Sequence, residues 1–329
     1  MTMTPTLLLN QSQVLAAIDM REALVAVEEI FRLHGRRQVQ MPSKVYLDLP
    51  GGDVRAMPAY APPLGFASIK NINMHPGNRD VPSIIGTLTL FDPPTGVPLA
   101  IMDATAITRL RTGAAAGVAT RLLARADATV LSVIGAGNQA LTQIEAVLAV
   151  RPRIDRVVIY DLDADRANRL ARSATDRFKV VMHVAGSVEE AVRAADVLTT
   201  ITPARAPIVA AEWVKPGTHI NAIGADAAGK QELESQLTTS AKVVVDEMDQ
   251  ATHSGEVNVP VSQGLLEPSA IYAELGHIAA SAKPGRLSAT EITIFDSTGL
   301  ALQDLACAAY VYRKVKAAGD APASFDFLA

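Results

Sequence analysis

The chain has 329 residues, of which 49% are hydrophobic and 19% carry a formal charge. This composition excludes a disordered chain, and this length is enough for two domains with their own cores. A formal net charge of −4 predicts neither nucleic acid nor an anionic membrane as a partner. The single cysteine, Cys307, excludes an internal disulfide and fits a reducing compartment, so we expect a cytoplasmic protein.

The first 120 residues predict a mixed α and β region. Asp19 and Glu22 have the spacing of a capping box, and the apolar residues after them repeat at helical intervals. A helix rich in small residues begins at Ala104. Between the two helices, strand patterns broken by proline and glycine lie at residues 44–47, 66–70, 84–91 and 97–102.

Residues 121–300 alternate apolar strand patterns with helical ones, which is typical of a doubly wound parallel sheet of the Rossmann type. A helical pattern at 300–318 closes the chain. We therefore expect an α/β protein in which a domain at 121–300 is inserted between an α+β region at 1–120 and a C-terminal helix within 301–329. The predicted strands are 129–134, 157–160, 180–184, 197–201, 218–223, 242–246 and 291–295.

A glycine turn after the first of these strands is the most informative motif. Gly135-x-Gly137-x-x-Ala140 joins an apolar strand to a helix, an arrangement that binds a dinucleotide pyrophosphate at the helix N-terminus. Asp161 ends the next strand, where a carboxylate bonds the ribose 2′-hydroxyl and repels a 2′-phosphate, so NAD is predicted over NADP. Arg166 is near enough in sequence to accommodate a 2′-phosphate, so NADP remains an alternative. A glycine turn that binds no nucleotide is the other interpretation of the motif.

Several cations lie in or beside short apolar strands of the N-terminal region. Lys44, Arg55 and Lys70 are such residues, and lysine or arginine close to buried strands suits an anionic ligand such as a carboxylate. Surface cations with buried stems are the alternative. Arg111, at a helix, suits either a phosphate or a substrate carboxylate.

The loop after residue 223 contains Asp226. If this carboxylate is shielded from water, it can act as a general acid or base. The alternative is an N-cap for a helix starting at Gln231. The six histidines show no metal-binding spacing, so no metal is expected. Neither a GxSxG elbow nor a GxxxxGK[ST] loop is present, which argues against hydrolases and NTPases.

Seven motifs in this order resemble the ornithine cyclodeaminase/mu-crystallin family over roughly residues 40 to 315. Residues 44–60 look most like its alanine dehydrogenase branch. The motifs are Met41-Pro42-Ser43-Lys44, Arg55-Ala56-Met57-Pro58, Lys70-x-x-Asn73-x-His75-Pro76-x-Asn78, Arg111-Thr112-Gly113-Ala114-Ala115, Gly135-x-Gly137-x-x-Ala140, Asn221-Ala222-Ile223-Gly224-Ala225-Asp226-x-x-Gly229-Lys230 and Asp296-Ser297-Thr298-Gly299.

The resemblance implies an NAD(P)-linked homodimer whose N-terminal region and last helix form the substrate and dimerisation domain. By resemblance, Lys70 contacts the substrate carboxylate and the reacting centre, and Asp226 is the acid/base group. Lys44, Arg55 and Thr298 match substrate-side positions. The cofactor-side positions are Ser83, Arg111, Thr202, Lys230 and Ser297, in addition to the glycine motif (Gly135, Gly137, Asn138, Gln139) and Asp161.

The resemblance implies an NAD-dependent oxidoreductase that interconverts a small L-amino acid and its 2-oxo acid or imine, as an alanine dehydrogenase or a ketimine reductase does. The first alternative is an ornithine cyclodeaminase, which releases ammonia and proline and uses NAD catalytically. Ornithine needs an acidic partner for its δ-amine, and none is identified in the N-terminal region, where Asp48 and Asp53 are candidates without further support. The second alternative is a crystallin-like protein that binds ligand without catalysis.

Overall fold

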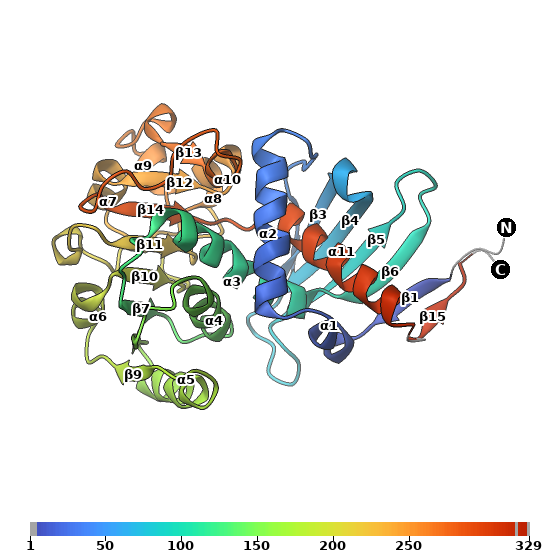
Figure 1. Ribbon diagram of the computed structural model, residues 1–329, viewed down its shortest axis with the longest axis horizontal. Helices are drawn as coiled ribbons and strands as arrows, with labels where there is room; N and C mark the ends of the chain where they lie inside the picture. Colours follow the sequence, from blue (N-terminus) through green and yellow to red (C-terminus); the bar gives the residue numbers. More distant parts are fainter. Residues whose placement is uncertain (1–4, 320–321, 328–329) are drawn as a thin grey trace. The chain divides into compact units, whose positions relative to one another are not determined.

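The computed structural model describes residues 5–319 and 322–327, and the chain divides into two compact units (Figure 1). Unit 1 is the chain up to Arg111 together with the segment from Leu300 onwards, and unit 2 runs from Thr112 to Gly299. The chain leaves unit 1 inside helix α3 (Ala104–Leu123), so this division lies earlier than the boundary expected at 120. No described helix is long and apolar enough to cross a membrane.

Unit 1 is built on a seven-stranded sheet in the order β15-β1-β6-β5-β4-β3-β2. Neighbours from β2 to β6 are antiparallel, whereas β1 is parallel to β6. The sequence patterns missed β1, β3 and β15. Strands β1 and β15 are too short to show an alternating pattern, whereas β3 was not recognised although it has ten residues. The strands are β1 (Thr6–Leu9), β2 (Val45–Leu49), β3 (Gly52–Ala61), β4 (Phe66–Met74), β5 (Ile84–Phe91), β6 (Pro98–Asp103) and β15 (Ser324–Phe325).

Helices cover one face of this sheet (Figure 1). The predicted capping box is present at the start of α2 (Met20–Gly35), where Asp19 and Glu22 bond each other's backbone N–H groups. Helix α11 (Ala301–Ala318) packs against α2 and against β3, β4 and β5. A short helix α1 (Gln11–Ala17) and a 3-10 turn at Pro62–Leu64 complete the unit.

The strand register assigns each side chain of unit 1 to the covered or the open face. Met57, Lys70, Leu88 and Met102 lie directly opposite one another on β3 to β6 and are buried, so they belong to the covered face. Ile69 and its neighbours in the register point to the other face. Lys70 therefore lies beneath the helices, in line with core residues.

Unit 2 is an eight-stranded sheet in the order β13-β12-β14-β11-β10-β7-β8-β9, and every neighbouring pair is parallel. The predicted α/β class with a parallel sheet is therefore confirmed. The strands are β7 (Val130–Ile134), β8 (Arg156–Tyr160), β9 (Val181–Val184), β10 (Val197–Thr200), β11 (His219–Ala222), β12 (Lys242–Val245), β13 (Ala273–Glu274) and β14 (Thr293–Asp296).

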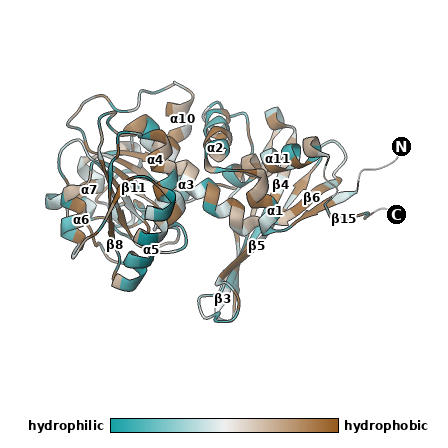
Figure 2. Ribbon diagram, turned by 60° about the horizontal axis from the view of Figure 1, so that its bottom comes forward, coloured by the Kyte–Doolittle hydropathy of each residue, from teal (hydrophilic) through white to brown (hydrophobic). Residues whose placement is uncertain are grey.

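The central strands of unit 2 are buried along their whole length, and apolar side chains predominate in β7 (Figure 2). Polar residues of these strands, such as His219 and Asn221 of β11, are buried as well. Helix α5 is strongly amphipathic and turns its polar face to solvent. The helices are α4 (Ala140–Val150), α5 (Ala164–Arg177), α6 (Val188–Ala194), α7 (Ser235–Ser240), α8 (Met248–Ser254), α9 (Asn258–Ser262) and α10 (Leu275–Ala279), with 3-10 turns at Ala211–Trp213 and Pro268–Ala270.

Strand order places a topological switch point at the carboxyl edge of the unit 2 sheet. The chain runs outward from β7 through β8 to β9, then returns to the other side of β7 with β10. At such a switch point the loops after the two strands diverge and leave room for a ligand. The glycine turn follows β7 and Thr202 follows β10, so both lie at this point.

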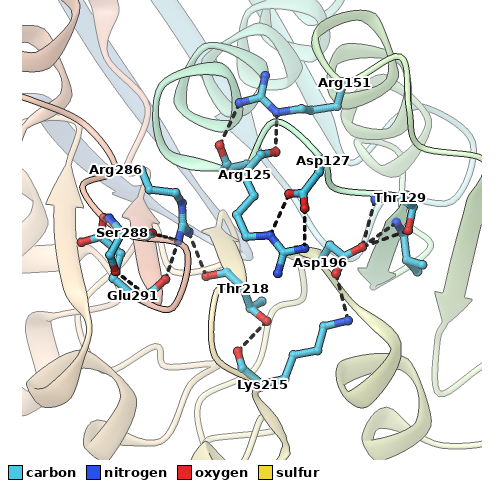
Figure 3. Close-up of polar contacts among 12 residues, drawn as sticks. Arg125, Asp127, Thr129, Arg151, Asp196, Lys215, Thr218, Arg286, Ser288 and Glu291 are labelled. Atoms are coloured by element: carbon cyan, nitrogen blue, oxygen red, sulfur yellow. Dashed lines mark hydrogen bonds and ion pairs between the residues drawn. The ribbon is translucent and has the colours of Figure 1, made fainter.

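The amino edge of the same sheet holds a network of charged side chains (Figure 3). Asp196 accepts hydrogen bonds from the backbone N–H of Thr129 at 2.9 Å and pairs with Lys215 at 2.9 Å. Arg151 donates to carbonyl oxygens at the end of α3, and Arg286 donates to the backbone of Glu291 and Leu123. These charged side chains form hydrogen bonds with the backbone of their own unit. We therefore infer that they stabilise the fold of unit 2 and do not bind a ligand.

Candidate functional site

The glycine turn after β7 has the geometry of a phosphate loop. Gly135 has φ of 105°, and a Cβ there would lie 2.6 Å from the carbonyl oxygen of Ile201, so only glycine fits. A Cβ on Gly137 would meet no described atom within 4 Å, which leaves space beside the backbone. Helix α4 begins next, and its N-cap Gln139 makes no side-chain capping bond. This helix N-terminus suits an anion.

Two residues of this loop, Gln139 and Asn138, have side chains that a bound nucleotide could reach. The Oε1 atom of Gln139 is buried without a hydrogen-bond partner among the described residues, and Asn138 is exposed beside it. A buried acceptor of this kind requires a donor. Pyrophosphate oxygens only accept hydrogen bonds, so the donor to Gln139 would be a hydroxyl or a water, and the phosphates themselves suit the N-terminus of α4.

Asp161 binds the glycine turn directly. Its Oδ2 accepts the backbone N–H of Ala136 at 2.7 Å, and its Oδ1 accepts that of Asp163 at 2.9 Å. This carboxylate lies where a ribose hydroxyl is bonded in dinucleotide-binding domains. Arg166, which could have favoured a 2′-phosphate, is exposed and pairs with Asp163 at 3.3 Å.

A buried carboxylate holds the loop that carries Thr202. Oε1 of Glu232 accepts both the backbone N–H and the hydroxyl of Thr202 at 2.7 Å, and its Oε2 accepts the N–H of Gly224 at 2.9 Å. Burial raises the pKa of Glu232, although these hydrogen bonds oppose the rise. Glu232 therefore ties together the loops after β10 and β11.

Asp226 lies in the loop after β11 and pairs with Lys230, whose Nζ is 2.5 Å from Oδ1. Both side chains are partly buried. The N-cap interpretation of Asp226 is wrong, because Gln231 is not helical and the next helix, α7, begins at Ser235 after Glu234. The carboxylate is held in place by a cation instead.

The loop after β14 carries Ser297 and Thr298 and is fixed by Asp246. The N–H of Thr298 and that of Gly299 each donate to Oδ2 of Asp246 at 2.7 Å, and the Thr298 hydroxyl donates to Oδ1 at 2.8 Å. Ser297 is buried, and its backbone N–H donates to the carbonyl oxygen of Ala222 at 3.1 Å. Both residues thus lie at the same edge of the sheet as the glycine turn.

Two more buried acids support these loops. Glu256 accepts the N–H groups of Glu232 and Leu233, and Asp296 accepts that of Val257 at 3.1 Å. Burial raises the pKa of Glu256 well above its usual range and that of Asp296 to about 8. The second oxygen of Asp296 has no hydrogen-bond partner among the described residues.

In unit 1, Lys70 lies in a buried polar cluster on the covered face of the sheet. Its side chain is 1% exposed, and its Nζ lies 2.9 Å from Oδ2 of Asp304 and 3.2 Å from the hydroxyl of Thr108. Burial lowers the pKa of Lys70 to about 7; Asp304 raises it, while Arg111 and Lys44 lower it. A lysine with a pKa near neutrality is a candidate for chemistry.

Arg111 belongs to the same cluster. Its Nε is 3.1 Å from Oδ1 of Asp304, and its Nη1 donates to Oε1 of Gln303 at 3.1 Å. Asp304 is therefore shared by two cations. Because Arg111 and Lys70 share this partner, Arg111 is also a candidate for binding the substrate. The predicted contact between Arg111 and the cofactor stays a prediction.

Arg55 is on β3, on the same face as Lys70 according to the register. Its Nε forms an ion pair with Oδ1 of Asp53 at 2.8 Å. Its Cζ lies over the ring of Tyr46, 5.4 Å from the ring centroid. Lys44 precedes β2 and is near enough to Lys70 to act on its charge. The three strand cations of unit 1 are thus grouped on one face.

Ser83 lies just before β5, and its carbonyl accepts the N–H of His75 at 2.8 Å. This contact closes the loop between β4 and β5 and gives no information about a cofactor. No group of three or more histidine, cysteine, aspartate or glutamate side chains suitable for a metal occurs among the described residues.

With the exception of Ser83, the predicted residues thus form two sets. One lies along the carboxyl edge of unit 2, and the other on the covered face of unit 1. The acids that hold both sets were not predicted from the sequence, although the signal for Asp304 was present as an acid next to Gln303 in the otherwise apolar stretch 300–309. The unit 2 set contains Gly135, Gly137, Asn138, Gln139, Asp161, Thr202, Asp226, Lys230, Ser297 and Thr298, and the unit 1 set contains Lys44, Arg55, Lys70 and Arg111.

Comparisons with known proteins cover the whole of this architecture. The model of the ornithine cyclodeaminase/mu-crystallin family matches residues 4–319. An alanine dehydrogenase of Archaeoglobus fulgidus is 49% identical over 311 residues, which are 93% of this chain and 94% of that protein.

Two solved structures resemble the chain throughout. An archaeal alanine dehydrogenase dimer with bound NAD has a TM-score of 0.94 and 46% identity, covering 99% of this chain and 100% of that one. The Δ1-pyrroline-2-carboxylate reductase of Thermococcus litoralis, in complex with NADH and L-proline, has a TM-score of 0.92 and 34% identity over 95% of this chain and 98% of that one.

Proposed function

The chain belongs to the ornithine cyclodeaminase/mu-crystallin family, and from this premise we propose that it is an NAD-dependent oxidoreductase that interconverts a small L-amino acid and its 2-oxo acid or imine. The observation that carries the proposal is the bond between Asp161 and the glycine turn, which joins a ribose-binding carboxylate to a phosphate loop. The relatives described above, an alanine dehydrogenase and an imine reductase, support this reaction class.

Unit 2 would hold NAD at the carboxyl edge of its sheet. Its phosphates fit the open space at Gly137 and the start of α4, and its adenosine ribose fits Asp161. Thr202, Lys230 and Ser297 follow neighbouring strands and are the proposed contacts to the rest of the cofactor. When bound, the cofactor supplies the hydride or accepts it.

Unit 1 would bind the substrate. Two cations share one buried carboxylate in the cluster of Lys70, Arg111 and Asp304, so the cluster carries excess positive charge that a substrate carboxylate balances. Lys70 donates to that carboxylate and polarises the C=N or C=O bond. Lys44 and Arg55 line the same face of the sheet and complete the anion site.

Asp226 is the proposed acid/base group. Lys230 holds one of its oxygens, which orients the carboxylate for proton transfer. In the direction of amino-acid oxidation it takes a proton from the amine or from the attacking water. Thr298, fixed by Asp246, is the proposed polar neighbour of the substrate.

The assembly we propose is a homodimer formed through unit 1. The open face of its sheet carries exposed apolar residues, which supports a protein partner there. The archaeal alanine dehydrogenase structure described above is a dimer. In the strand register, Val45, Leu47 and Leu49 of β2, Ile69 of β4 and Ile85 of β5 share this face.

The test is turnover by the purified protein. With ammonium and a panel from pyruvate to cyclic imines, we expect the absorbance of NADH to fall, and to fall faster than that of NADPH. Ornithine with catalytic NAD runs in parallel. Release of proline and ammonia without net NADH change would show a cyclodeaminase, and binding without turnover on any substrate would show a crystallin-like protein; either result contradicts the proposal.

A further inference from the structure

Asp304 lies where three elements of unit 1 meet. It is in the first turn of α11 and its side chain is fully buried. One oxygen is 2.9 Å from Nζ of Lys70 on β4, and the other is 3.1 Å from Nε of Arg111 on α3. A single carboxylate therefore fixes the spacing of two cations that come from different elements.

The direction of the Lys70 ammonium is also determined. The hydroxyl of Thr108 donates its proton to the carbonyl of Ala104 at 2.7 Å, so it accepts from Lys70 at 3.2 Å. Two N–H groups of Lys70 thus have fixed acceptors, Thr108 and Asp304. An ammonium has three donors, so the direction of its third follows from the other two.

The charge of Lys70 depends on the same carboxylate. The groups that act on Lys70 are Asp304 from α11, Arg111 from α3 and Lys44 ahead of β2, and the neighbouring Cys307 thiol stays neutral because burial raises its pKa to about 12. Of these, only Asp304 favours the protonated lysine; burial and both cations oppose it. Loss of Asp304 would leave a neutral amine at physiological pH.

We propose that Asp304 is a positioning residue of the reaction: its two oxygens hold the Lys70 ammonium and the Arg111 guanidinium in a fixed relation and keep Lys70 charged and aimed before the substrate carboxylate arrives. The proposal rests on the proposed function. Asp304 does not touch substrate or cofactor, and acts through Lys70.

The decisive variant is Asp304→Asn, which keeps the shape and removes the charge. Activity that needs protonated Lys70 declines on the alkaline side of the pH profile of kcat/KM. In the variant this decline moves to lower pH, and each unit of movement costs about tenfold in kcat/KM at a fixed pH. KM for the carboxylate substrate rises more than kcat falls, and lowering the pH restores part of the activity.

The matched control is Cys307→Ala, which changes a buried side chain of the same helix without changing charge. It should keep the wild-type pH profile. Asp304→Glu retains the charge and should keep the alkaline decline near its wild-type position, even with a lower kcat. If the asparagine variant does not fold, Asp304→Ser is the second neutral variant.

The titration of Lys70 can also be measured directly, without turnover, by NMR of protein whose lysines are labelled at the ε-carbon. The Lys70 signal is assigned as the one that disappears in Lys70→Met. The midpoint of its titration should fall in Asp304→Asn and stay close to wild type in Asp304→Glu and Cys307→Ala. An unchanged midpoint and pH profile in Asp304→Asn, or the same change in Cys307→Ala, would overturn the proposal. If the wild type turns over no substrate, the proposed function fails, and the titration still decides the role of Asp304.

Discussion

At the scale of single residues, the groups proposed to do chemistry differ from those that hold loops in the partners they bind. Lys70 and Asp226 each have a partner of opposite charge and lie where a ligand is expected. Asp246, Glu232 and Glu256 instead use their oxygens to accept backbone N–H groups. Asp161 also accepts two backbone N–H groups, and its proposed bond to a ribose hydroxyl would use the remaining lone pairs of its oxygens.

The proposed acid/base role of Asp226 can be tested by Asp226→Asn. The amide cannot take up a proton at neutral pH, so kcat should fall by about 10²–10⁴-fold. NADH affinity, measured by the quenching of Trp213 fluorescence, should change little. Asp249→Asn, an exposed acid of α8, is the control and should leave kcat unchanged. A kcat for Asp226→Asn within a few-fold of wild type would remove Asp226 from the mechanism.

The buried Asp296 predicts how stability depends on pH. Burial raises its pKa from 3.8 to about 8, so between these values the folded state binds more protons than the unfolded state. Stability therefore falls as the pH rises from about 4 to about 8, by up to about 1.4 kcal/mol per pH unit for this group.

Asp296→Asn should remove this part of the pH dependence, because the amide needs no proton to be neutral. Above pH 8 the variant should be more stable than wild type, whereas near pH 5 the two should be similar. Urea unfolding at a series of pH values measures both. Equal slopes of unfolding free energy against pH in the two proteins would show that Asp296 is ionised in the folded state.

At the scale of elements, the glycine turn and the strands beside it were predictable because their requirements are local. Fully buried parallel strands favour runs of mostly apolar residues, and the turn needs glycine for its positive φ. The predicted strands of unit 2 lie within two residues of those observed. The short strand β13 escaped prediction because two residues show no periodicity.

Gly135 and Gly137 should respond differently to the same substitution. Gly135→Ala places a Cβ 2.6 Å from the Ile201 carbonyl at a positive φ, so it should destabilise unit 2 by about 1–3 kcal/mol or more. Gly137→Ala points into open space and should leave stability nearly unchanged while it weakens NADH binding.

Thermal unfolding and NADH titration of both variants check this pair. Gly264→Ala is the control for strain alone, since Gly264 also has a positive φ but has open space around it. If Gly137→Ala binds NADH as tightly as wild type, the cofactor phosphates do not approach this turn.

At the scale of the whole molecule, the open sheet face of unit 1 determines the expected assembly. Ile69 and Ile85 lie on this face and are 38% and 43% exposed. Exposed apolar side chains that share one face favour association. The predicted homodimer would cover it.

Ile69→Glu should convert the dimer to a monomer, because it would bury a charge without a partner in the interface. Size-exclusion chromatography with light scattering measures the mass. Leu287→Glu introduces the same charge at an exposed position of unit 2 and should leave the dimer intact. A dimeric Ile69→Glu protein, or a monomeric wild type, would rule out this face as the interface.

The sequence by itself determined the parallel α/β unit, the dinucleotide turn and the family, because each depends on residues that are close together in the chain. Only the tertiary structure showed that Asp304 meets Lys70, from which it is separated by 234 positions, and that it is shared with Arg111. A local pattern records that a side chain is apolar or charged. It does not record which distant partner satisfies a buried charge, because that depends on how helices and strands pack.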